Sequence, residues 1–306
     1  MGLGCWQFSE GGGLGGSYWP TLTPETENQI VAVSLAAGIN WFDTAEMYGA
    51  GRSEAALSRA LLAAGRKNGE VVVATKWMPL LRTSRSITKT IGERRARLAP
   101  FDIDLHQVHQ PIAFSTIRAQ MNAMADLVAA GAIRTVGVSN FSERRMRRAH
   151  AALAARGLPL VSNQVRYSLL DRRIETNGVL AAARELGITI IAYSPLAQGI
   201  LSGKFHRDPD LIRKRSGPRK WLGAFRRSGL ERSRPLVSVL EEIAAAHGAT
   251  PSQVALNWLA NAHGETVVVI PGATSVAQAE ENGRCLGFTL TEAEFRRIDE
   301  SSRQFR

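Results

Sequence analysis

The feature that most constrains the fold is a regular alternation of short β-branched runs with longer amphipathic segments along the whole chain. The runs are almost continuously apolar, as in Val71-Val72-Val73-Ala74, which is typical of parallel strands buried on both faces. Eight strands are expected, at residues 2–5, 40–43, 71–75, 103–109, 135–138, 160–163, 188–193 and 266–270. The helical spacing between them predicts helices at 24–37, 53–64, 84–98, 115–130, 142–155, 178–186 and 234–246, and then at 275–283 and 291–300.

Eight strand–helix repeats predict a closed (β/α)8 barrel, a TIM barrel, because a doubly wound sheet usually stops at about five or six strands. A chain of 306 residues has the length for one such barrel, and no linker divides it, so residues 1–306 are expected to form a single domain. Two long connections, 10–20 and 199–233, follow the first and seventh strands. They are expected at the carboxyl ends of the strands, where barrels of this kind build their active sites.

The formal net charge of +11 is the unusual feature of the composition. Much of it lies between residues 207 and 234. We interpret this segment as a solvated basic surface, because it lacks the aromatic spacing of a nucleic-acid module. No apolar run is long enough to cross a membrane and no signal peptide is recognised. Cys5 and Cys285 give neither a disulfide framework nor a metal pattern, so a cytoplasmic protein is expected, with its oligomeric state left open.

Polar side chains end the early strands. Asp43 closes the second strand and Tyr48 follows it, while Lys76 and His109 end the third and fourth strands. Because the carboxyl ends of the strands meet at one mouth of a barrel, we expect these four side chains to converge there.

Several short motifs resemble those of the aldo-keto reductases. The run Asp43-Thr44-Ala45-Glu46-Met47-Tyr48-Gly49 is similar to the Asp-Thr-Ala-x-x-Tyr-Gly signature of that family. Further motifs match in order along nearly the whole chain: Gly137-Val138-Ser139-Asn140-Phe141, Asn163-Gln164, Ala192-Tyr193-Ser194-Pro195-Leu196 and Ile270-Pro271-Gly272. The resemblance implies an enzyme that reduces aldehydes and ketones to alcohols with a nicotinamide cofactor.

The resemblance also implies a role for each of the four strand-end residues. Tyr48 is expected as the general acid, and the Lys76 ammonium beside it is expected to lower its pKa from about 10. Asp43 would hold Lys76 charged and in place. His109 would hydrogen-bond the substrate carbonyl and orient it.

Cofactor residues follow from the same resemblance. Ser139, Asn140 and Gln164 match positions that hold the nicotinamide carboxamide, although Ser139 and Asn140 are also explained as caps of the following helix. The matching positions are Gly4, Cys5, Trp6, Ser139, Asn140, Gln164, Tyr193, Ser194, Leu196, Gly199, Thr274, Ser275, Gln278, Glu281 and Asn282. Tyr193 would stack on the nicotinamide ring, Ser194, Leu196 and Gly199 would surround the pyrophosphate, and Glu281 and Asn282 would hold the adenosine end.

Two departures from the family pattern bear on these expectations. Gly272 and Gln278 stand where many relatives have Lys and Arg for a 2′-phosphate, so only neutral hydrogen bonds from Thr274 and Ser275, at a helix N-terminus, are expected there. NADP(H) is still favoured, with NAD(H) as the alternative. The chain also begins directly at its first strand, so the family's N-terminal hairpin plug is expected to be absent or to lie upstream.

The substrate is expected to be a small carbonyl compound. Trp19, Trp77 and Trp221 fall in or near strand-end loops and are expected to form an aromatic pocket. Arg219 and Lys220 in the basic connection would favour an anionic substrate.

Three alternatives stay open at this point. Gly11-x-Gly13-x-x-Gly16 matches the dinucleotide fingerprint of a doubly wound dehydrogenase, but the residues after it interrupt the required strand-to-helix turn. A metal-dependent hydrolase would use His106 and His109, which alternate to opposite faces of a strand; no metal site is expected. A nicotinamide-binding regulatory or redox-sensing subunit with little turnover is the third alternative.

Overall fold

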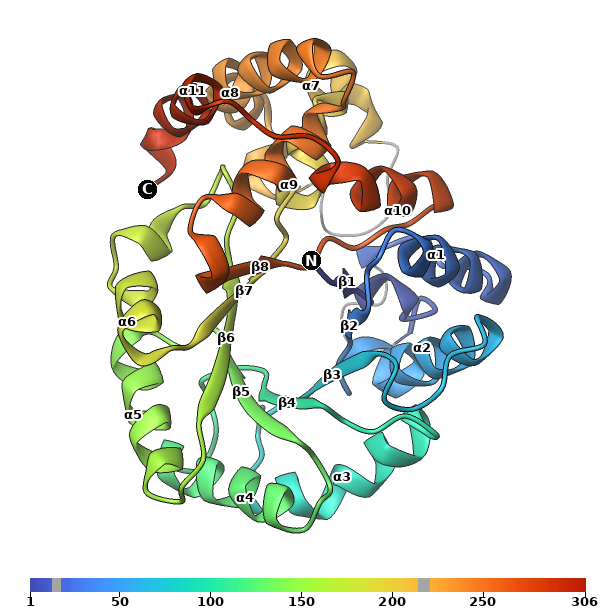
Figure 1. The fold of residues 1–306 in the computed structure, drawn as a ribbon, viewed down its shortest axis with the longest axis vertical. Coiled ribbons are helices and arrows are strands. Elements are labelled where there is room, and N and C mark those ends of the chain that lie inside the picture. The colour runs from blue at the N-terminus through green and yellow to red at the C-terminus, as the bar shows by residue number, and fades with distance from the viewer. Residues whose placement is uncertain (13–17, 214–220) are drawn as a thin grey trace.

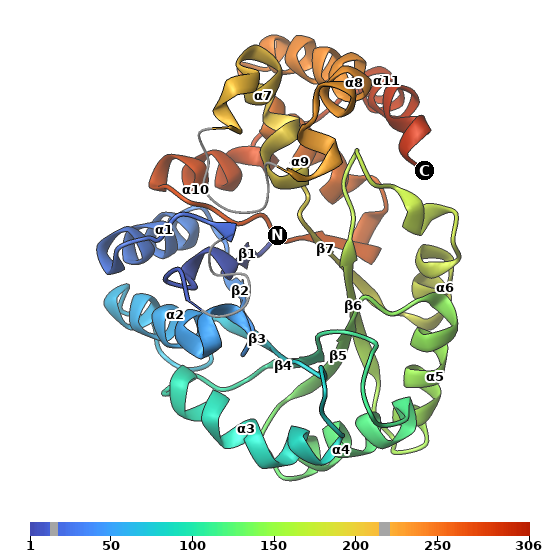
Figure 2. The same ribbon diagram turned by 180° about the vertical axis from the view of Figure 1, so that it is seen from behind.

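The computed structural model describes residues 1–12, 18–213 and 221–306. Eight parallel strands form one sheet in sequence order, β1 to β8, so every neighbour in the sequence is also a neighbour in space. Figures 1 and 2 show these strands at the centre and the helices around them. The strand bounds are Leu3–Gly4, Trp41–Asp43, Val72–Trp77, Leu105–Val108, Thr135–Ser139, Leu160–Arg166, Thr189–Tyr193 and Val267–Val269.

The two ends of the sheet also meet. The Gly2 amide donates to the Val269 carbonyl at 2.9 Å, the Gly4 amide donates to the Pro271 carbonyl at 3.1 Å, and Gly4 forms a parallel bridge with Gly272. These bonds bring β1 beside β8, so the predicted (β/α)8 barrel is confirmed.

Helices cover the outside of the barrel (Figure 1). The first six, each between successive strands, are α1 to α6, at Pro24–Ala36, Arg52–Ala63, Arg85–Leu98, Ile117–Ala129, Glu143–Ala154 and Val179–Leu186. The remaining five are α7 to α11, at Lys204–Arg207, Arg227–Ala246, Pro251–Asn261, Val276–Gly283 and Glu292–Ser302. No helix in the described ranges is both long enough and apolar enough to span a lipid bilayer.

The helices between β7 and β8 depart from the sequence-based expectation. α9 was not expected, because its residues from Ser252 to Leu259 are all buried and a helix buried all round has no apolar stripe. The capping box between Thr250 and Gln253, with Pro251 at the first helical position, is the signal that marks its start. α8 begins at Arg227, earlier than the expected residue 234, and continues through Pro235.

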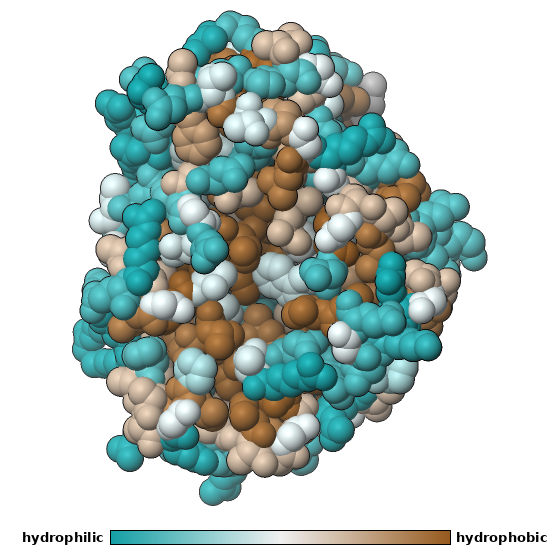
Figure 3. All heavy atoms as spheres, viewed as in Figure 1, coloured by the Kyte–Doolittle hydropathy of each residue, from teal (hydrophilic) through white to brown (hydrophobic). Residues whose placement is uncertain are grey.

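The interior of the barrel is filled by apolar side chains from alternate strand positions, among them Ala74, Leu105, Ile191 and Ile270. A larger apolar layer packs between the strands and the helices. On the face seen in Figure 3, hydrophobic side chains gather about the centre and hydrophilic ones cover most of the periphery.

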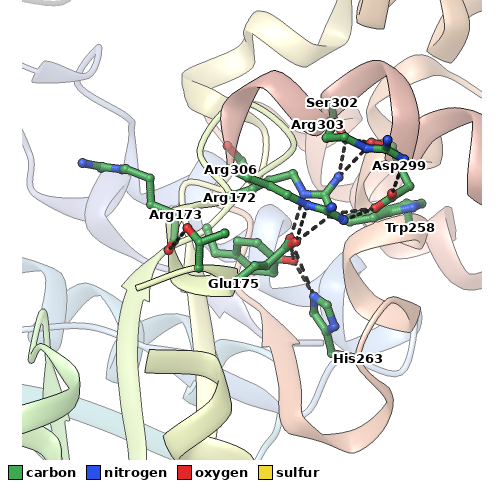
Figure 4. A network of polar contacts seen from close by, with 12 residues as sticks. Arg172, Arg173, Glu175, Trp258, His263, Asp299, Ser302, Arg303 and Arg306 are labelled. Atoms are coloured by element: carbon green, nitrogen blue, oxygen red, sulfur yellow. Dashed lines mark hydrogen bonds and ion pairs between the residues drawn. The ribbon is translucent and has the colours of Figure 1, made fainter. Parts of the chain in front are cut away.

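The C-terminal helix is held by the loop after β6 (Figure 4). Arg172 in that loop is almost completely buried, pairs with Glu175 and Asp299, and lies over the Trp258 ring. The contact joins α9 and α11 to the carboxyl end of β6.

Candidate active site

A cavity of about 700 Å³ opens at the carboxyl ends of the strands. Its volume is in the range of small-molecule sites. Its walls include residues at or near the carboxyl ends of β1, β2, β4, β5, β6, β7 and β8, namely Gly4, Asp43, His109, Ser139, Gln164, Tyr193 and Gly272. The cavity therefore lies at the mouth of the barrel, where the sequence predicted the site.

A tight turn after β2 presents Tyr48 to this cavity. The Tyr48 amide donates to the Ala45 carbonyl at 3.0 Å, which closes the turn. Gly49 follows with a φ of 63°, and a Cβ there would lie 2.4 Å from the Ser9 carbonyl oxygen. Only glycine fits both this positive φ and the close contact with Ser9. Gly49 therefore determines the path of the backbone directly after Tyr48.

Lys76 lies beneath Tyr48 and is completely buried. Its ammonium is paired with the Asp43 carboxylate, donates to the Thr44 carbonyl at 2.8 Å, and lies 3.4 Å from the Tyr48 hydroxyl oxygen. A buried charge requires such partners. The structure thus brings Asp43, Tyr48 and Lys76 into one hydrogen-bonded cluster.

The second Asp43 oxygen is also occupied. It accepts from the side-chain amide of Gln164 at 2.8 Å and from that of Gln107 at 3.1 Å. Gln107 was not expected from the sequence. The alternation along β4 is the signal that identifies it, since it lies two residues before His109 on the same side of the strand.

The electrostatic effect on Tyr48 differs from the simple expectation. Burial raises the pKa of Tyr48 above its ordinary value, and the Lys76 ammonium opposes this rise without cancelling it. The expected net lowering of this pKa is therefore corrected. Burial also acts to lower the pKa of Lys76, but Asp43 and Tyr48 raise it, and the net shift is upward. Lys76 accordingly stays charged at neutral pH.

His109 faces Tyr48 across the base of the cavity, with ring centroids 5.6 Å apart. Burial, reinforced by the Lys76 charge, lowers the pKa of His109 to about 3. Its Nδ1 is buried without a hydrogen-bond partner among the described residues. His109 is therefore a neutral imidazole at neutral pH, able to donate one hydrogen bond.

His106 and His109 make stability depend on pH. Burial also lowers the pKa of His106 to about 3, against about 6.5 in an unfolded chain. The unfolded state binds more protons between these values, so stability is lost as the pH falls below about 6.5. From pH 7 to pH 5 we expect a loss of about 2 kcal/mol per histidine.

Urea titrations at pH 7 and pH 5, of wild type and His106→Phe, measure this contribution. The variant keeps a planar ring but cannot titrate, so its loss between the two pH values should be smaller by about 2 kcal/mol. Carboxylates titrate equally in both proteins and cancel. An identical pH dependence would show that His106 does not titrate as described.

The residues expected to hold the nicotinamide carboxamide form a connected group. Asn140 donates to the His109 carbonyl at 3.2 Å and to the Ser139 hydroxyl at 3.1 Å, and it accepts from the Tyr193 hydroxyl at 2.9 Å. The cap of α5 is Ser142, which makes no side-chain capping bond. Ser139 and Asn140 therefore do not cap this helix, and the capping explanation is wrong.

The segment after β7 has an unusual backbone. Ser194, Ala197 and Gln198 have positive φ values of 52°, 47° and 59°, and Gly199 follows with 92°. Non-glycine residues rarely adopt this conformation, and turns of this kind make concave sites for anions. Ser194, Leu196 and Gly199 all line the cavity.

Four of the five residues expected around α10 line the cavity. Thr274 donates through both its amide and its hydroxyl to the Gln278 side chain, at 2.9 and 3.0 Å. Both residues line the cavity, as do Glu281 and Asn282. Ser275 does not. Its hydroxyl caps α10 by accepting from the Gln278 amide, so the expectation that it faces the cofactor is corrected.

Several cavity residues were not expected from the sequence. Lys204 and Arg207 on α7 line the cavity, and Arg207 is also paired with Glu241 at 2.6 Å. Their signal was the pair of basic residues within four positions after Gly203 in the long connection. Gln110 and Arg166 also line the cavity.

Of the four tryptophans expected at the site, two line the cavity and two are not part of its described lining. Trp6 stacks on Tyr48 with centroids 6.0 Å apart, and Trp19 packs edge-on against Trp6 at 5.8 Å; Cys5 and Gly4 lie beside them. Trp77 is fully buried on the outer side of β3 and donates to Ser86 at 3.0 Å. It follows Lys76, which faces inward, so alternation turns it away. The prediction for Trp77 is wrong.

Trp221 is 71% exposed and does not belong to the described lining of the cavity. Its expected place in the pocket is therefore corrected. Arg219 and Lys220 lie outside the described residues, and the proposed anion-attracting role of these two side chains stays a prediction.

Two of the alternatives fail on the fold and the site. The chain after β1 enters a 3-10 turn at Trp6–Phe8 rather than a helix, and the sheet is an eight-stranded barrel, so the doubly wound dehydrogenase is excluded; Gly13 and Gly16 lie outside the described residues. His106 is completely buried beside Arg94 and is not a wall of the cavity. In the described part of the chain, no three His, Cys, Asp or Glu side chains are grouped as a metal site, and both cysteines are free and buried.

Comparison with known proteins agrees with this geometry. The chain is 39% identical to an uncharacterised oxidoreductase of Mycobacterium tuberculosis over 306 residues, which cover all of this chain and 90% of that protein. It is 32% identical to the NADP(+) aldo-keto reductase yakc of Schizosaccharomyces pombe, over 98% of this chain and 87% of that protein.

Solved structures have the same fold. The glycerol dehydrogenase of Gluconobacter oxydans superimposes with a TM-score of 0.82 at 26% identity, over 99% of this chain and 91% of that one. The family model of the aldo/keto reductases matches residues 1–303. The chain therefore belongs to the aldo/keto reductase family of oxidoreductases.

Proposed function

We propose that this protein reduces aldehydes and ketones to alcohols with a reduced nicotinamide cofactor, using Tyr48 as the general acid. The observation that carries the proposal is the buried cluster of Tyr48, Lys76 and Asp43 at the base of the cavity. The cluster places a proton donor next to a charge that stabilises the donor's conjugate base. Proton donation by a positioned side chain contributes about 10²- to 10⁴-fold to such reactions.

Each of the four side chains has a separate role in the proposed reaction. The Tyr48 hydroxyl gives its proton to the carbonyl oxygen of the substrate, and the Lys76 ammonium at 3.4 Å stabilises the phenolate that remains. Asp43 keeps Lys76 charged and fixed through their buried ion pair. The neutral His109 imidazole donates a hydrogen bond to the same carbonyl oxygen, which orients the substrate and favours the developing charge.

A bound reduced nicotinamide supplies the hydride for this reaction. Asn140, Ser139 and Gln164 would hold its carboxamide, and Tyr193 would cover its ring. The residues fit this group because a cavity of about 700 Å³ runs from Tyr48 past these side chains to α10. The positive φ values from Ser194 to Gly199 give a concave backbone suited to a pyrophosphate.

NADP(H) is the proposed cofactor, with NAD(H) as the alternative. Gly272 and Gln278 supply no charge for a 2′-phosphate, but Lys204 and Arg207 line the same cavity as Thr274 and Gln278. A charge-assisted hydrogen bond contributes about 1.5–3 kcal/mol. The name of the Schizosaccharomyces pombe relative includes NADP(+), which supports the same choice.

Lys204→Ala tests this choice of cofactor. We expect the Kd for NADPH to rise about tenfold, because a cation is lost near the 2′-phosphate, and the Kd for NADH to change less than about twofold. Nicotinamide fluorescence measures both values. Lys89→Ala, an exposed lysine on α3, is the matched control. Equal weakening of both cofactors would place Lys204 elsewhere along the nucleotide.

The substrate is proposed to be a small carbonyl compound with an apolar or aromatic body, since Trp6, Tyr18 and Trp19 form an aromatic wall beside Tyr48. No nucleic-acid or membrane partner is proposed. The regulatory or redox-sensing alternative is not favoured, because the relatives are named as oxidoreductases and reductases.

The experiment is a titration of the purified protein with NADPH and NADH, followed by a panel of aldehydes and ketones. Saturable cofactor binding with turnover of at least one carbonyl class is the expected result. Binding without turnover would favour the regulatory alternative. Failure to bind either nucleotide would contradict the proposal.

A further inference from the structure

Glu46 lies inside the turn that presents Tyr48. The Tyr48 amide donates to the Ala45 carbonyl, so Glu46 is the second residue of a four-residue turn. Its carboxylate is buried and is not a wall of the cavity. A buried carboxylate so close in sequence to Tyr48 and outside the cavity needs its own explanation.

Glu46 is hydrogen-bonded to the end of β3, the strand that carries Lys76. Its amide donates to the Lys76 carbonyl at 3.2 Å, and its carboxylate accepts from the Met78 amide. Glu46 is thus bonded to the backbone on both sides of Trp77, at the end of β3. Any displacement of Glu46 along β3 would change the separation of the Tyr48 hydroxyl and the Lys76 ammonium.

Two arginines form ion pairs with the Glu46 carboxylate. Arg82 donates to Oε1 at 2.6 Å, and Arg94 on α3, which is 2% exposed, pairs with Oε2. Thr90 accepts from both guanidinium groups, each at 2.9 Å. A carboxylate that is paired at each oxygen has one orientation, because any rotation breaks a charge-assisted bond.

We propose that Glu46 is a positioning residue which, through Arg82 and Arg94, sets the Tyr48 hydroxyl at its distance from the Lys76 ammonium. The inference rests on the proposed function and goes beyond it, since Glu46 touches neither substrate nor cofactor. In this proposal Glu46 aligns the general acid Tyr48 and takes no part in proton or hydride transfer itself.

Glu46→Gln is the first test. The amide keeps an acceptor for Met78 and Arg82 but turns an NH₂ group toward Arg94, which loosens the turn. We expect kcat for aldehyde reduction to fall about tenfold. The Kd for NADPH should stay within about twofold, because the groups bonded to Glu46 are not among the proposed cofactor residues. Glu292→Gln removes an exposed carboxylate paired with Arg296 and should leave kcat unchanged.

The pH profile separates positioning from a merely structural role. When Tyr48 moves away from Lys76, the ammonium lowers its pKa less, so the alkaline limb of kcat should move to higher pH. The charged and titratable groups that face Tyr48 are Asp43, Lys76, His109 and Tyr193, and all are unchanged in the variant. Simple loss of folded protein would lower the rate without moving the limb.

A double variant that should restore kcat, and a single variant of Arg82, test the proposal independently. Glu46→Gln combined with Arg94→Gln pairs two neutral amides, and we expect kcat to recover to within about threefold of wild type, as coupled residues do. If Glu46→Gln does not fold, Arg82→Gln should lower kcat about threefold and move the limb in the same direction. Wild-type kcat and an unmoved limb in the folded variant would overturn the inference.

One readout does not require turnover. The phenol of Tyr48 can be titrated by ultraviolet difference against Tyr48→Phe, in wild type and in Glu46→Gln. A higher pKa in the variant supports the positioning role even if no substrate is found. Equal titration in both proteins overturns it, whereas failure of the proposed function would show as absent turnover in wild type.

Discussion

Tyr48→Phe should abolish most of the turnover while leaving the cofactor bound. We expect kcat for aldehyde reduction to fall about 10³-fold, because the carbonyl oxygen loses its proton donor. The Kd for NADPH should stay within about twofold. The fold should be unaffected, since the Lys76 ammonium keeps its bonds to Asp43 and to the Thr44 carbonyl.

The matched control removes a different buried tyrosine hydroxyl. Tyr167 lies outside the cavity, where its hydroxyl contacts Glu175 and His263, each at 2.6 Å. Tyr167→Phe should cost stability but keep kcat within about threefold. Steady-state kinetics with one aldehyde, together with fluorescence titration of the cofactor, measures both. If Tyr48→Phe kept more than about a tenth of the wild-type rate, another group would be the acid.

The strands were predictable because most of their residues are apolar and buried. Runs such as Val71–Ala74 have no polar interruption, and the eight predicted strands all correspond to observed ones. α9 was not predictable from periodicity, because it is buried all round and has no polar face. The sequence signal for this helix is the capping box at Thr250, which is local and not periodic.

The centre of the site was predictable for a different reason. Asp43, Lys76 and His109 end parallel strands, and a barrel brings strand ends to one mouth. Side-chain direction was the weaker inference, as Trp77 shows, because a shift of one residue turns a side chain to the opposite face. Alternation from Lys76 already assigns Trp77 to the outer layer.

The supporting contacts were beyond the sequence. Glu46 is 36 residues from Arg82, and nothing in either local pattern indicates that they meet. Gln107 reaches Asp43 across 64 residues. The direction of the Tyr48 pKa was missed for a related reason. The sequence identified the nearby ammonium but gave no measure of how completely the phenol is buried.

Arg172→Met should cause the largest loss of stability. All the donors of this guanidinium are used, and it is 1% exposed. It donates to Glu175 at 2.7 and 2.8 Å, to the Asp299 carboxylate at 2.6 Å, to the Ser302 hydroxyl at 2.6 Å and to the Asp299 carbonyl at 3.1 Å. Figure 4 shows it between these partners.

The expected loss of stability comes from the two carboxylates, Glu175 and Asp299, that Arg172→Met leaves without this guanidinium. Glu175 keeps Tyr167, His263 and Arg306 as partners, and Asp299 keeps Arg306 at 2.8 Å. Both carboxylates nevertheless lose their buried cation, and breaking such a pair costs about 3–5 kcal/mol. For a barrel of this size the Tm should fall by about 5–10 °C. Thermal unfolding followed by circular dichroism measures the change.

The neighbouring arginine separates this effect from a general loss of positive charge. Arg173 is 71% exposed and pairs with Asp171, so Arg173→Met should change the free energy of unfolding by less than about 0.5 kcal/mol. Arg172→Lys should fall between the two variants, because an ammonium keeps the charge but cannot reach Glu175, Asp299 and Ser302 together. If Arg172→Met and Arg173→Met unfolded at the same temperature, α11 would be held by its apolar contacts alone, and the ion pairs at the carboxyl end of β6 would contribute nothing measurable.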